Sequence, residues 1–143
     1  MTSPIDLQDK LRELRVLPSE TEWIEFKEAK NTFDFDDLGK YFSALSNEAN
    51  LKNQPSGWLV FGLRDKPIPR QIVGTNYRPQ RPDLDSLKQE IANGTSHRIT
   101  FEEIHELQTP DGRVLLFQIP AALRGSGPKA AWRLSTKEKN DTD

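Results

Sequence analysis

The 143-residue sequence predicts an α+β domain, with a mixed, largely antiparallel sheet of about five to six strands flanked by about three helices. Three observations predict this class. Residues 38–45 carry apolar side chains at helical spacing. Residues 58–61 are a short apolar run, typical of a central strand that is buried on both faces. Two alternating segments, 99–107 and 114–119, surround a turn sequence and predict a hairpin.

The composition suits one domain and excludes several classes of protein. The formal net charge is −2, so phosphate binding would need a local group of Lys and Arg side chains. The absence of cysteine excludes disulfides and thiolate metal sites, and His97 and His105 match no zinc-ligand spacing. The first residues resemble no signal peptide, and no apolar run approaches the roughly 18 residues of a membrane span. We therefore expect a cytoplasmic protein with no membrane partner.

The first two expected elements are a helix and a strand. The helix is expected to begin at Ser3 as N-cap, with a proline next, and to end near Arg15. An alternating, aromatic-rich strand is expected at residues 22–28. The alternation places Ile24 and Phe26 on one face of that strand, and Trp23, Glu25 and Lys27 on the other.

The next elements are a long helix and two strands. The helix is expected to begin at Asp36 as N-cap and to fade by Asn50. Its apolar stripe is Leu38, Tyr41, Phe42 and Leu45. A central strand is expected at 58–61, and a short edge-like strand at 71–74.

The last part of the chain predicts a third helix and the hairpin. Asp83 or Asp85 is expected to open the helix, and Gly94 to end it. The strand at 99–107 alternates with one slip that indicates a bulge, and a turn at 109–112 connects it to the strand at 114–119.

Five short motifs in order along residues 18–124 resemble the Schlafen AlbA_2 family. They are Glu20 followed by Glu25-Phe26-Lys27, Ser43-Ala44 with Asn47, Gly57 to Gly62 closing in Asp65, Val73-Gly74, and Ile119-Pro120. The family is described as a proposed DNA-binding or divergent ATPase-like domain. The resemblance implies a nucleic-acid-binding module, of bacterial origin and with a role in transcription regulation.

Two departures from the family pattern concern Ser56 and the C-terminus. The family usually has a Gly-Gly pair before the central strand, where this chain has Ser56-Gly57. The family also continues after Ile-Pro into a further strand, where this chain becomes unpatterned. We therefore divide the chain into an N-terminal helix (1–17), the AlbA_2-like domain (18–123), and a disordered or truncated tail (124–143). Loss of that strand would leave an exposed sheet edge, which favours a homo-oligomer.

The resemblance also implies a catalytic and metal-binding set of carboxylates, Glu20, Glu25 and Asp65. Nuclease-type relatives use carboxylates at these motif positions, and Mg²⁺ or Mn²⁺ needs only a few of them beside water and a phosphate. On an uninterrupted strand Glu20 and Glu25 would face opposite sides, so their convergence needs a bend near Pro18. The alternative is that the three are solvated charges or ion-pair partners of nearby Lys and Arg.

Phosphate contacts are expected from basic side chains, mostly in the loop-rich stretch after the central strand. The candidates are Lys27, Lys30, Arg64, Lys66, Arg70, Arg78, Arg81 and Arg98. An ordinary solvated surface is the alternative, since acidic residues are about as numerous. Trp23, Trp58 and Trp132 could stack bases or simply pack in the core.

Three functions remain open from the sequence. The first is a nucleic-acid-binding module for DNA or RNA. The second is a divalent-metal-dependent endoribonuclease, and the third is a non-catalytic protein-interaction module, which the acidic pI of about 5.8 favours. Gly57 and Gly62 have the glycine spacing of a phosphate-binding loop but fall within a strand, so we expect no ATPase site.

Overall fold

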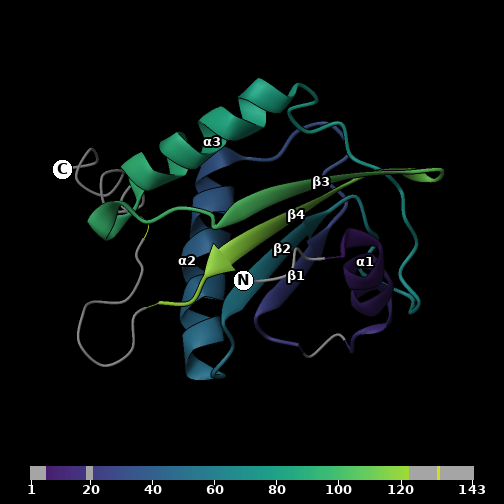
Figure 1. Ribbon diagram of the computed structural model, residues 1–143, viewed down its shortest axis with the longest axis horizontal. Helices are drawn as coiled ribbons and strands as arrows, with labels where there is room; N and C mark the ends of the chain where they lie inside the picture. The colour runs from purple at the N-terminus through teal and green to yellow at the C-terminus, as the bar shows by residue number, and fades with distance from the viewer. Residues whose placement is uncertain (1–5, 19–20, 123–131, 133–143) are drawn as a thin grey trace.

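The computed structural model describes residues 6–18, 21–122 and 132, and it has an α+β architecture (Figure 1). The helices and strands are α1 (Leu7–Val16), β1 (Ile24–Lys27), α2 (Phe35–Leu51), β2 (Ser56–Phe61), α3 (Arg81–Gly94), the 3₁₀ turn η1 (Ser96–Arg98), β3 (Glu103–Thr109) and β4 (Gly112–Pro120). The strand order is β1-β2-β4-β3, with β1 and β2 parallel and the other pairs antiparallel. Three α-helices and a mixed, mainly antiparallel sheet confirm the predicted class.

The sheet has four strands among the described residues, so the expected number of five to six is not confirmed. The segment 71–74 makes only one bridge, between Leu63 and Ile72. The amides of Val73 and Gly74 both donate to the Gly62 carbonyl, at 2.8 and 3.0 Å. Gly74 has a φ of 82°, so the chain turns away there instead of continuing alongside β2.

The sheet lies between two layers of helix (Figure 1). On one face, α2 and α3 bury a core with Leu59, Phe61 and Phe117 of the sheet. On the other face, α1 packs against Trp58 and Val60. Every residue of β2 is buried, because helices cover both of its faces, and this confirms the expected central strand.

The helices begin at other residues than expected. Asp6 is the N-cap of α1, and its carboxylate accepts from the amides of Gln8 and Asp9, so the prediction that Ser3 caps this helix is wrong. Asp34, not Asp36, caps α2. Helix α3 begins at Arg81, ahead of the expected aspartates, with a proline in its first turn.

The predicted hairpin of β3 and β4 is confirmed, although β3 begins at Glu103 rather than at residue 99. The turn η1 precedes it, and His97 and Arg98 both have positive φ there. Phe101 lies outside the strand, but its ring contacts Phe42 and is buried. Apolar residues of the expected strand therefore pack in the core, but only those from Glu103 onward also pair with β4.

Trp132 is described and buried, whereas the rest of the predicted tail at 124–143 lies outside the described residues. It forms a bridge with Thr95, and its indole Nε1–H donates to Asp36 Oδ1 at 2.5 Å. Its ring also meets Phe35 edge-on, with 5.4 Å between the centroids. Trp132 therefore packs at the start of α2 and the end of α3. Among the described residues, no helix is long and apolar enough to cross a membrane.

Candidate functional site

The alternation of β1 determines which charged side chains face α2. Ile24 and Phe26 are buried on the α1 side, as the sequence predicts. Lys27 extends from the opposite face, and its Nζ lies 5.1 Å from the ring centroid of Tyr41 on α2 and 3.8 Å from Glu25 Oε2. Trp23 precedes the strand in a turn and packs on the Ile24 side, so its expected place beside Glu25 is wrong.

Glu25 and Asp65 lie close enough for their charges to interact. Burial raises the pKa of the Glu25 carboxyl; the Lys27 ammonium opposes this and the Asp65 carboxylate adds to it. The pKa of Lys27 is raised as well, first by its hydrogen bond with Tyr41. Asp65 also lies 3.5 Å from Arg70 Nε. The Asp65 carboxylate therefore acts on Glu25 through its charge, while its ion pair is with Arg70.

The third predicted carboxylate, Glu20, lies outside the described residues. Among residues 6–18, 21–122 and 132, no group of three acidic, histidine or cysteine side chains is placed to hold a metal ion. Mg²⁺ is commonly held by one or two carboxylates together with waters and substrate phosphates. Glu25 and Asp65 fit that smaller requirement by donor type.

Basic side chains surround the same end of β1. Arg64 Nε donates to Glu28 Oε2 at 3.0 Å, and Lys30 Nζ lies 3.7 Å from the other oxygen of Glu28. The backbone amide of Gly62 donates to the Lys27 carbonyl, which holds this segment against the end of β1. Lys66 is exposed beyond it. We call the group Glu25, Lys27, Glu28, Lys30, Arg64, Asp65 and Lys66 the β1 cluster.

Arg70, expected to contact phosphate, is instead fully buried. Its Nη1 donates to the carbonyls of Leu14 and Leu17 at 3.1 and 2.6 Å, at the C-terminal end of α1. Its guanidinium lies 3.9 Å from the ring centroid of Phe26. The planar guanidinium suits both stacking and carbonyl binding, so Arg70 anchors its loop to α1 and has no access to a surface ligand.

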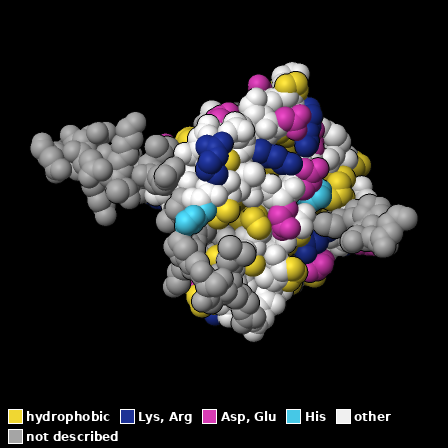
Figure 2. Space-filling view, turned by 60° about the vertical axis from the view of Figure 1, so that its left-hand side comes forward, with side chains coloured by type: hydrophobic (Ala, Val, Ile, Leu, Met, Phe, Trp, Pro, Cys, Tyr) yellow, Lys and Arg dark blue, Asp and Glu magenta, His cyan; other side chains and the backbone are white. Residues whose placement is uncertain are grey.

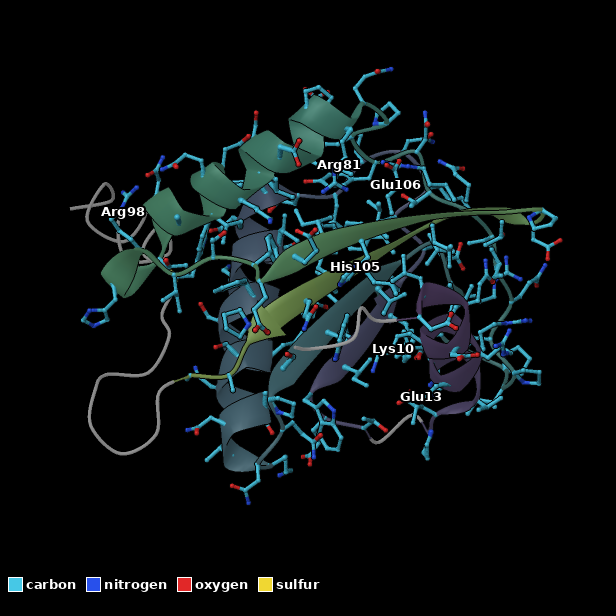
Figure 3. The ribbon with its side chains drawn as sticks, viewed as in Figure 1. Lys10, Glu13, Arg81, Arg98, His105 and Glu106 are labelled. Carbon is cyan, nitrogen blue, oxygen red and sulfur yellow. The ribbon has the colours of Figure 1, made fainter. Side chains whose placement is uncertain are left out.

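Arg78 precedes α3, Arg81 begins it and Arg98 follows it in η1, all outside the β1 cluster. Arg78 makes a two-bond pair with Glu90, at 2.8 and 2.9 Å, which lowers the pKa of that carboxyl. Arg81 donates to the Ile104 carbonyl of edge strand β3 at 2.9 Å. Arg81 and Arg98 lie near opposite ends of α3 (Figure 3). On the face in Figure 2, Lys and Arg are interspersed with Asp and Glu and form no single basic surface.

Arg113 is a structural arginine that the sequence analysis missed. It is buried, and its Nε donates to Glu106 Oε2 at 2.6 Å. Its other nitrogens donate to the carbonyls of Thr75, Tyr77 and Arg78. The sequence signal for such a role is the position of this arginine within the otherwise apolar strand 112–120. Arg70 and Arg113 together hold the loop from Leu63 to Gln80 against α1 and against the hairpin.

Two solved structures are similar to this chain, and the first of them agrees with this architecture. The DIP2311 protein from Corynebacterium diphtheriae has 20% sequence identity and a TM-score of 0.50 over 90% of this chain, which spans only 23% of that protein's length. The N-terminal domain of a RecG-related protein from Nitrosomonas europaea has 22% identity and a TM-score of 0.43, covering 93% of this chain and 88% of that domain. No curated protein sequence matches.

The sequence pattern of one family covers most of the chain. The family described as Schlafen, AlbA_2 matches residues 20–141, which include the β1 cluster and every strand of the sheet. The resemblance drawn from the five short motifs is thereby confirmed. The chain belongs to the Schlafen AlbA_2 family.

Proposed function

We propose that this chain binds nucleic acid, DNA or RNA, by contacting backbone phosphates with the β1 cluster. The observation that carries the proposal is that Lys30 and Arg64 meet at Glu28, close after Lys27 at the end of β1, with the exposed Lys66 two residues beyond Arg64. Phosphate contacts need such cations on a surface, and they need no base-reading groups. The AlbA_2 family resemblance points to the same class of partner.

Two of the four cations lie on a loop that buried arginines hold in place, and this favours binding at a fixed geometry. Arg70 and Arg113 fasten the loop that carries Arg64 and Lys66 to α1 and to the hairpin. A ligand that meets a preorganised surface loses less conformational entropy on binding. Three carboxylates within the cluster counter part of the positive charge, so we expect moderate affinity with few phosphate contacts.

A salt titration tests the proposal. Binding of labelled single-stranded RNA, transfer RNA and duplex DNA is measured by fluorescence anisotropy from low to high salt, with a chelator present. Four contacts predict a slope of log K against log salt no steeper than about −4 on duplex DNA and about −3 on single strands. A double variant, Lys30→Ala with Arg64→Ala, is expected to reduce the duplex slope by about 2.

Arg98→Ala is the matched control, because Arg98 is an exposed arginine near the far end of α3. Its slope should equal that of the wild type. Binding that is absent at low salt, or equal loss in the control and the double variant, would contradict the proposed interface. In that case the protein-interaction module, which the acidic pI favours, becomes the better account.

A second candidate function, a metal-dependent nuclease, rests on the Glu25–Asp65 pair. A partly buried carboxyl whose pKa is raised beside a second carboxylate is a common feature of functional sites. A divalent cation there would activate a water and neutralise charge on a phosphate. In this proposal Glu25, Asp65 and Glu20 hold the ion, and Lys27 and Arg64 position the phosphate.

Cleavage assays separate the two candidates. The same RNAs are incubated with Mn²⁺ and with chelator, using the wild type, Glu25→Gln, Asp65→Asn and, as the control, Asp85→Asn at an exposed position of α3. The nuclease predicts metal-dependent cutting that is lost in the first two variants, with binding and the control's cutting retained. Cutting that persists in Glu25→Gln would rule out this site, and binding without any cutting would leave the plain binding module.

A further inference from the structure

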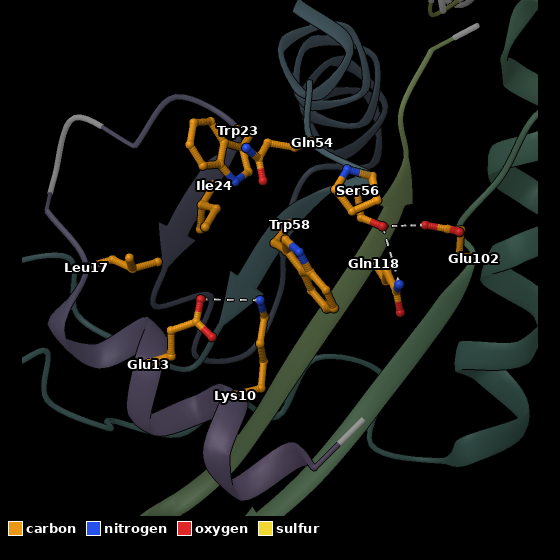
Figure 4. Close-up of a pocket in the computed structure, with 11 residues that line it drawn as sticks. Lys10, Glu13, Leu17, Trp23, Ile24, Gln54, Ser56, Trp58, Glu102 and Gln118 are labelled. Carbon is orange, nitrogen blue, oxygen red and sulfur yellow. Dashed lines mark hydrogen bonds and ion pairs between the residues drawn. The ribbon is translucent and has the colours of Figure 1, made fainter. Parts of the chain in front are cut away.

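A pocket of about 400 Å³ opens between α1 and the start of the sheet (Figure 4). Its lining includes Trp23, Gln54, Ser56, Trp58, Glu102 and Gln118. The volume is in the range of small-molecule sites, and such sites combine apolar walls with a few placed polar groups. The pocket is at the N-terminal ends of β1 and β2, whereas the β1 cluster gathers at the other end of β1.

Two indoles form the apolar wall, and they differ in what their faces contact. Trp58 has Lys10 Nζ at 4.5 Å from its ring centroid, and the His105 ring stacks on it at 6.0 Å. Trp23 is only partly buried, and no ring or cation contact is made to it by another described residue. Trp23 is therefore the indole that can offer a flat face to an incoming ring.

A hydrogen-bonded chain forms the polar wall. Ser56 Oγ donates to Glu102 Oε1 at 2.6 Å, and Gln118 Nε2 donates to Ser56 Oγ at 3.3 Å. His105 Nε2 lies 2.9 Å from Gln118 Oε1, and since an amide oxygen only accepts, that imidazole nitrogen is the donor. These hydrogen bonds fix the four side chains in place. The hydrogen bonds leave the second Glu102 oxygen available to accept from a ligand and the second amide hydrogen of Gln118 available to donate to one.

We propose that this pocket takes one unstacked nucleobase, or a free planar nitrogen heterocycle of the same kind, with its ring against Trp23 and its polar edge toward Glu102 and Gln118. A nucleobase combines a π-face with donors and acceptors along one edge, which is the complement of these two walls. Glu102 as an acceptor favours a base with an exocyclic amino group, such as cytosine or adenine.

The two sources of such a base are a nucleic acid and a free nucleoside. The nucleic-acid source rests on the proposed function. Ile24 and Lys27 mark the two ends of β1, which are about 10 Å apart at 3.3 Å per residue. The pocket lies on the α1 side of the sheet and Lys27 extends from the opposite face of β1, so a single strand that fills the pocket reaches the β1 cluster by passing around β1, which is an edge strand.

The first experiment compares a deoxycytidine 12-mer with an abasic 12-mer that has the same phosphates. For the wild type we expect the intact oligonucleotide to bind about tenfold more tightly, which is the typical value of one base stacked on an aromatic ring. Trp23→Ala should bring this ratio close to one without changing the salt dependence. Ile68→Ala, which removes an exposed apolar side chain from the loop beyond β2, is the control and should keep the ratio.

A second pair of variants tests the polar wall and leaves the indoles in place. Glu102→Gln should weaken the preference for a deoxycytidine over a thymidine 12-mer, because the carboxylate that accepts from the amino group is gone. Glu103→Gln is the matched control, since the neighbouring Glu103 pairs with Lys88 and does not line the pocket. Equal changes in the two variants would contradict the assignment of Glu102.

Free cytidine, followed by quenching of tryptophan fluorescence, separates the possible outcomes. Equal binding of the intact and abasic strands, with no quenching by cytidine, overturns the pocket inference and leaves the phosphate interface standing. Saturable quenching without any oligonucleotide binding overturns the proposed function and supports a free-ligand pocket. If no oligonucleotide binds and cytidine causes no quenching, both the pocket inference and the proposed function are overturned.

Discussion

Arg113 and Glu106 form an ion pair of 2.6 Å in which the arginine side chain is only 9% exposed and the glutamate 22%. The pair joins β4 to β3, and the remaining nitrogens of Arg113 reach the loop through the carbonyls of Thr75, Tyr77 and Arg78. One buried guanidinium thus connects the hairpin to the loop that extends from the β1 cluster. Its planar fork of donors fits this arrangement, whereas a lysine ammonium is a compact point charge.

Replacement of Arg113 should therefore lower stability more than the loss of a surface charge. We expect Arg113→Ala to reduce the free energy of unfolding by about 2–3 kcal/mol, because it leaves a partly buried carboxylate and loop carbonyls without their donor. Arg113→Lys should recover only part of this loss. Urea unfolding measures both, with exposed Arg12→Ala as the control, which should change stability by less than about 0.5 kcal/mol. Equal losses of stability at Arg113 and Arg12 would contradict the role of Arg113 in joining the hairpin to the loop.

Gly39 gives a prediction about Trp132. A Cβ added at Gly39 would lie 2.0 Å from the Trp132 ring, so α2 and the indole can pack this closely only with glycine there. We expect Gly39→Ala to destabilise the protein by about 1–3 kcal/mol through overpacking. In a Trp132→Ala background the same change should instead stabilise by about 0.5–1 kcal/mol, because alanine is the better helix former. Thermal unfolding of the four proteins completes the cycle.

A penalty for Gly39→Ala that is the same with and without Trp132 would show that the indole does not pack there. This test also bears on the chain beyond Ala122. The sequence predicts an unpatterned tail at 124–143, and Trp132 is the one residue of that tail that the structure describes.

The elements that could be predicted from sequence are those set by local periodicity. The apolar run of β2, the β3–β4 turn sequence and the alternation of Ile24 and Phe26 are local patterns, and the structure follows them. The starts of α1 and α2 could not be fixed to the residue, because Ser3 or Asp6 and Asp34 or Asp36 are all good caps by residue type. The N-cap of α3 is Gln80, which makes no side-chain hydrogen bond to the helix and so gives no sequence signal. The segment at 71–74 fails as a strand because Gly74 turns the chain, a tertiary outcome that its β-branched residues do not signal.

The candidate site was predicted only in part, for a related reason. The resemblance predicts Glu25 and Asp65 as members of one site; the Asp65 charge acts on Glu25, and the role of the two carboxylates stays a prediction. Arg70 was interpreted as a surface cation, because sequence alone does not reveal a guanidinium stacked on Phe26. The pocket could not be predicted, because Gln54, Glu102 and Gln118 come from distant segments that share no motif.

Capping of α2 provides a further prediction. Asp34 Oδ2 accepts from the Asp37 amide at 3.0 Å, whereas Asp36 lies in the first turn and accepts from Trp132. Asp34→Ala should cost about 1 kcal/mol, and Asp34→Asn should cost much less, because asparagine caps about as well. The comparison is made by urea unfolding. An equal loss in the two variants would mean that the negative charge, and not the cap, is responsible.

The raised pKa of Glu25 predicts how stability depends on pH at the β1 cluster. Because folding raises this pKa above its usual value of 4.5, the folded state binds the proton more tightly than the unfolded state does. The resulting stabilisation is present below the unfolded pKa and is lost as the pH rises through the folded pKa. Glu25→Gln should therefore be more stable than the wild type at pH 7, and this advantage should shrink at pH 4.

Glu90 is the control, because its pKa is lowered in the folded protein, whereas that of Glu25 is raised. The Arg78 hydrogen bonds lower its pKa, so its contribution to stability is present above the unfolded pKa and is lost as the pH falls through the folded pKa. Glu90→Gln should therefore lose most relative to the wild type at pH 7 and least in acid. Melting temperatures of the three proteins from pH 3 to pH 7 measure both trends. Parallel curves for the two variants would show that burial does not raise the pKa of Glu25 in the folded protein, and would remove the electrostatic support for Glu25 as a functional carboxyl.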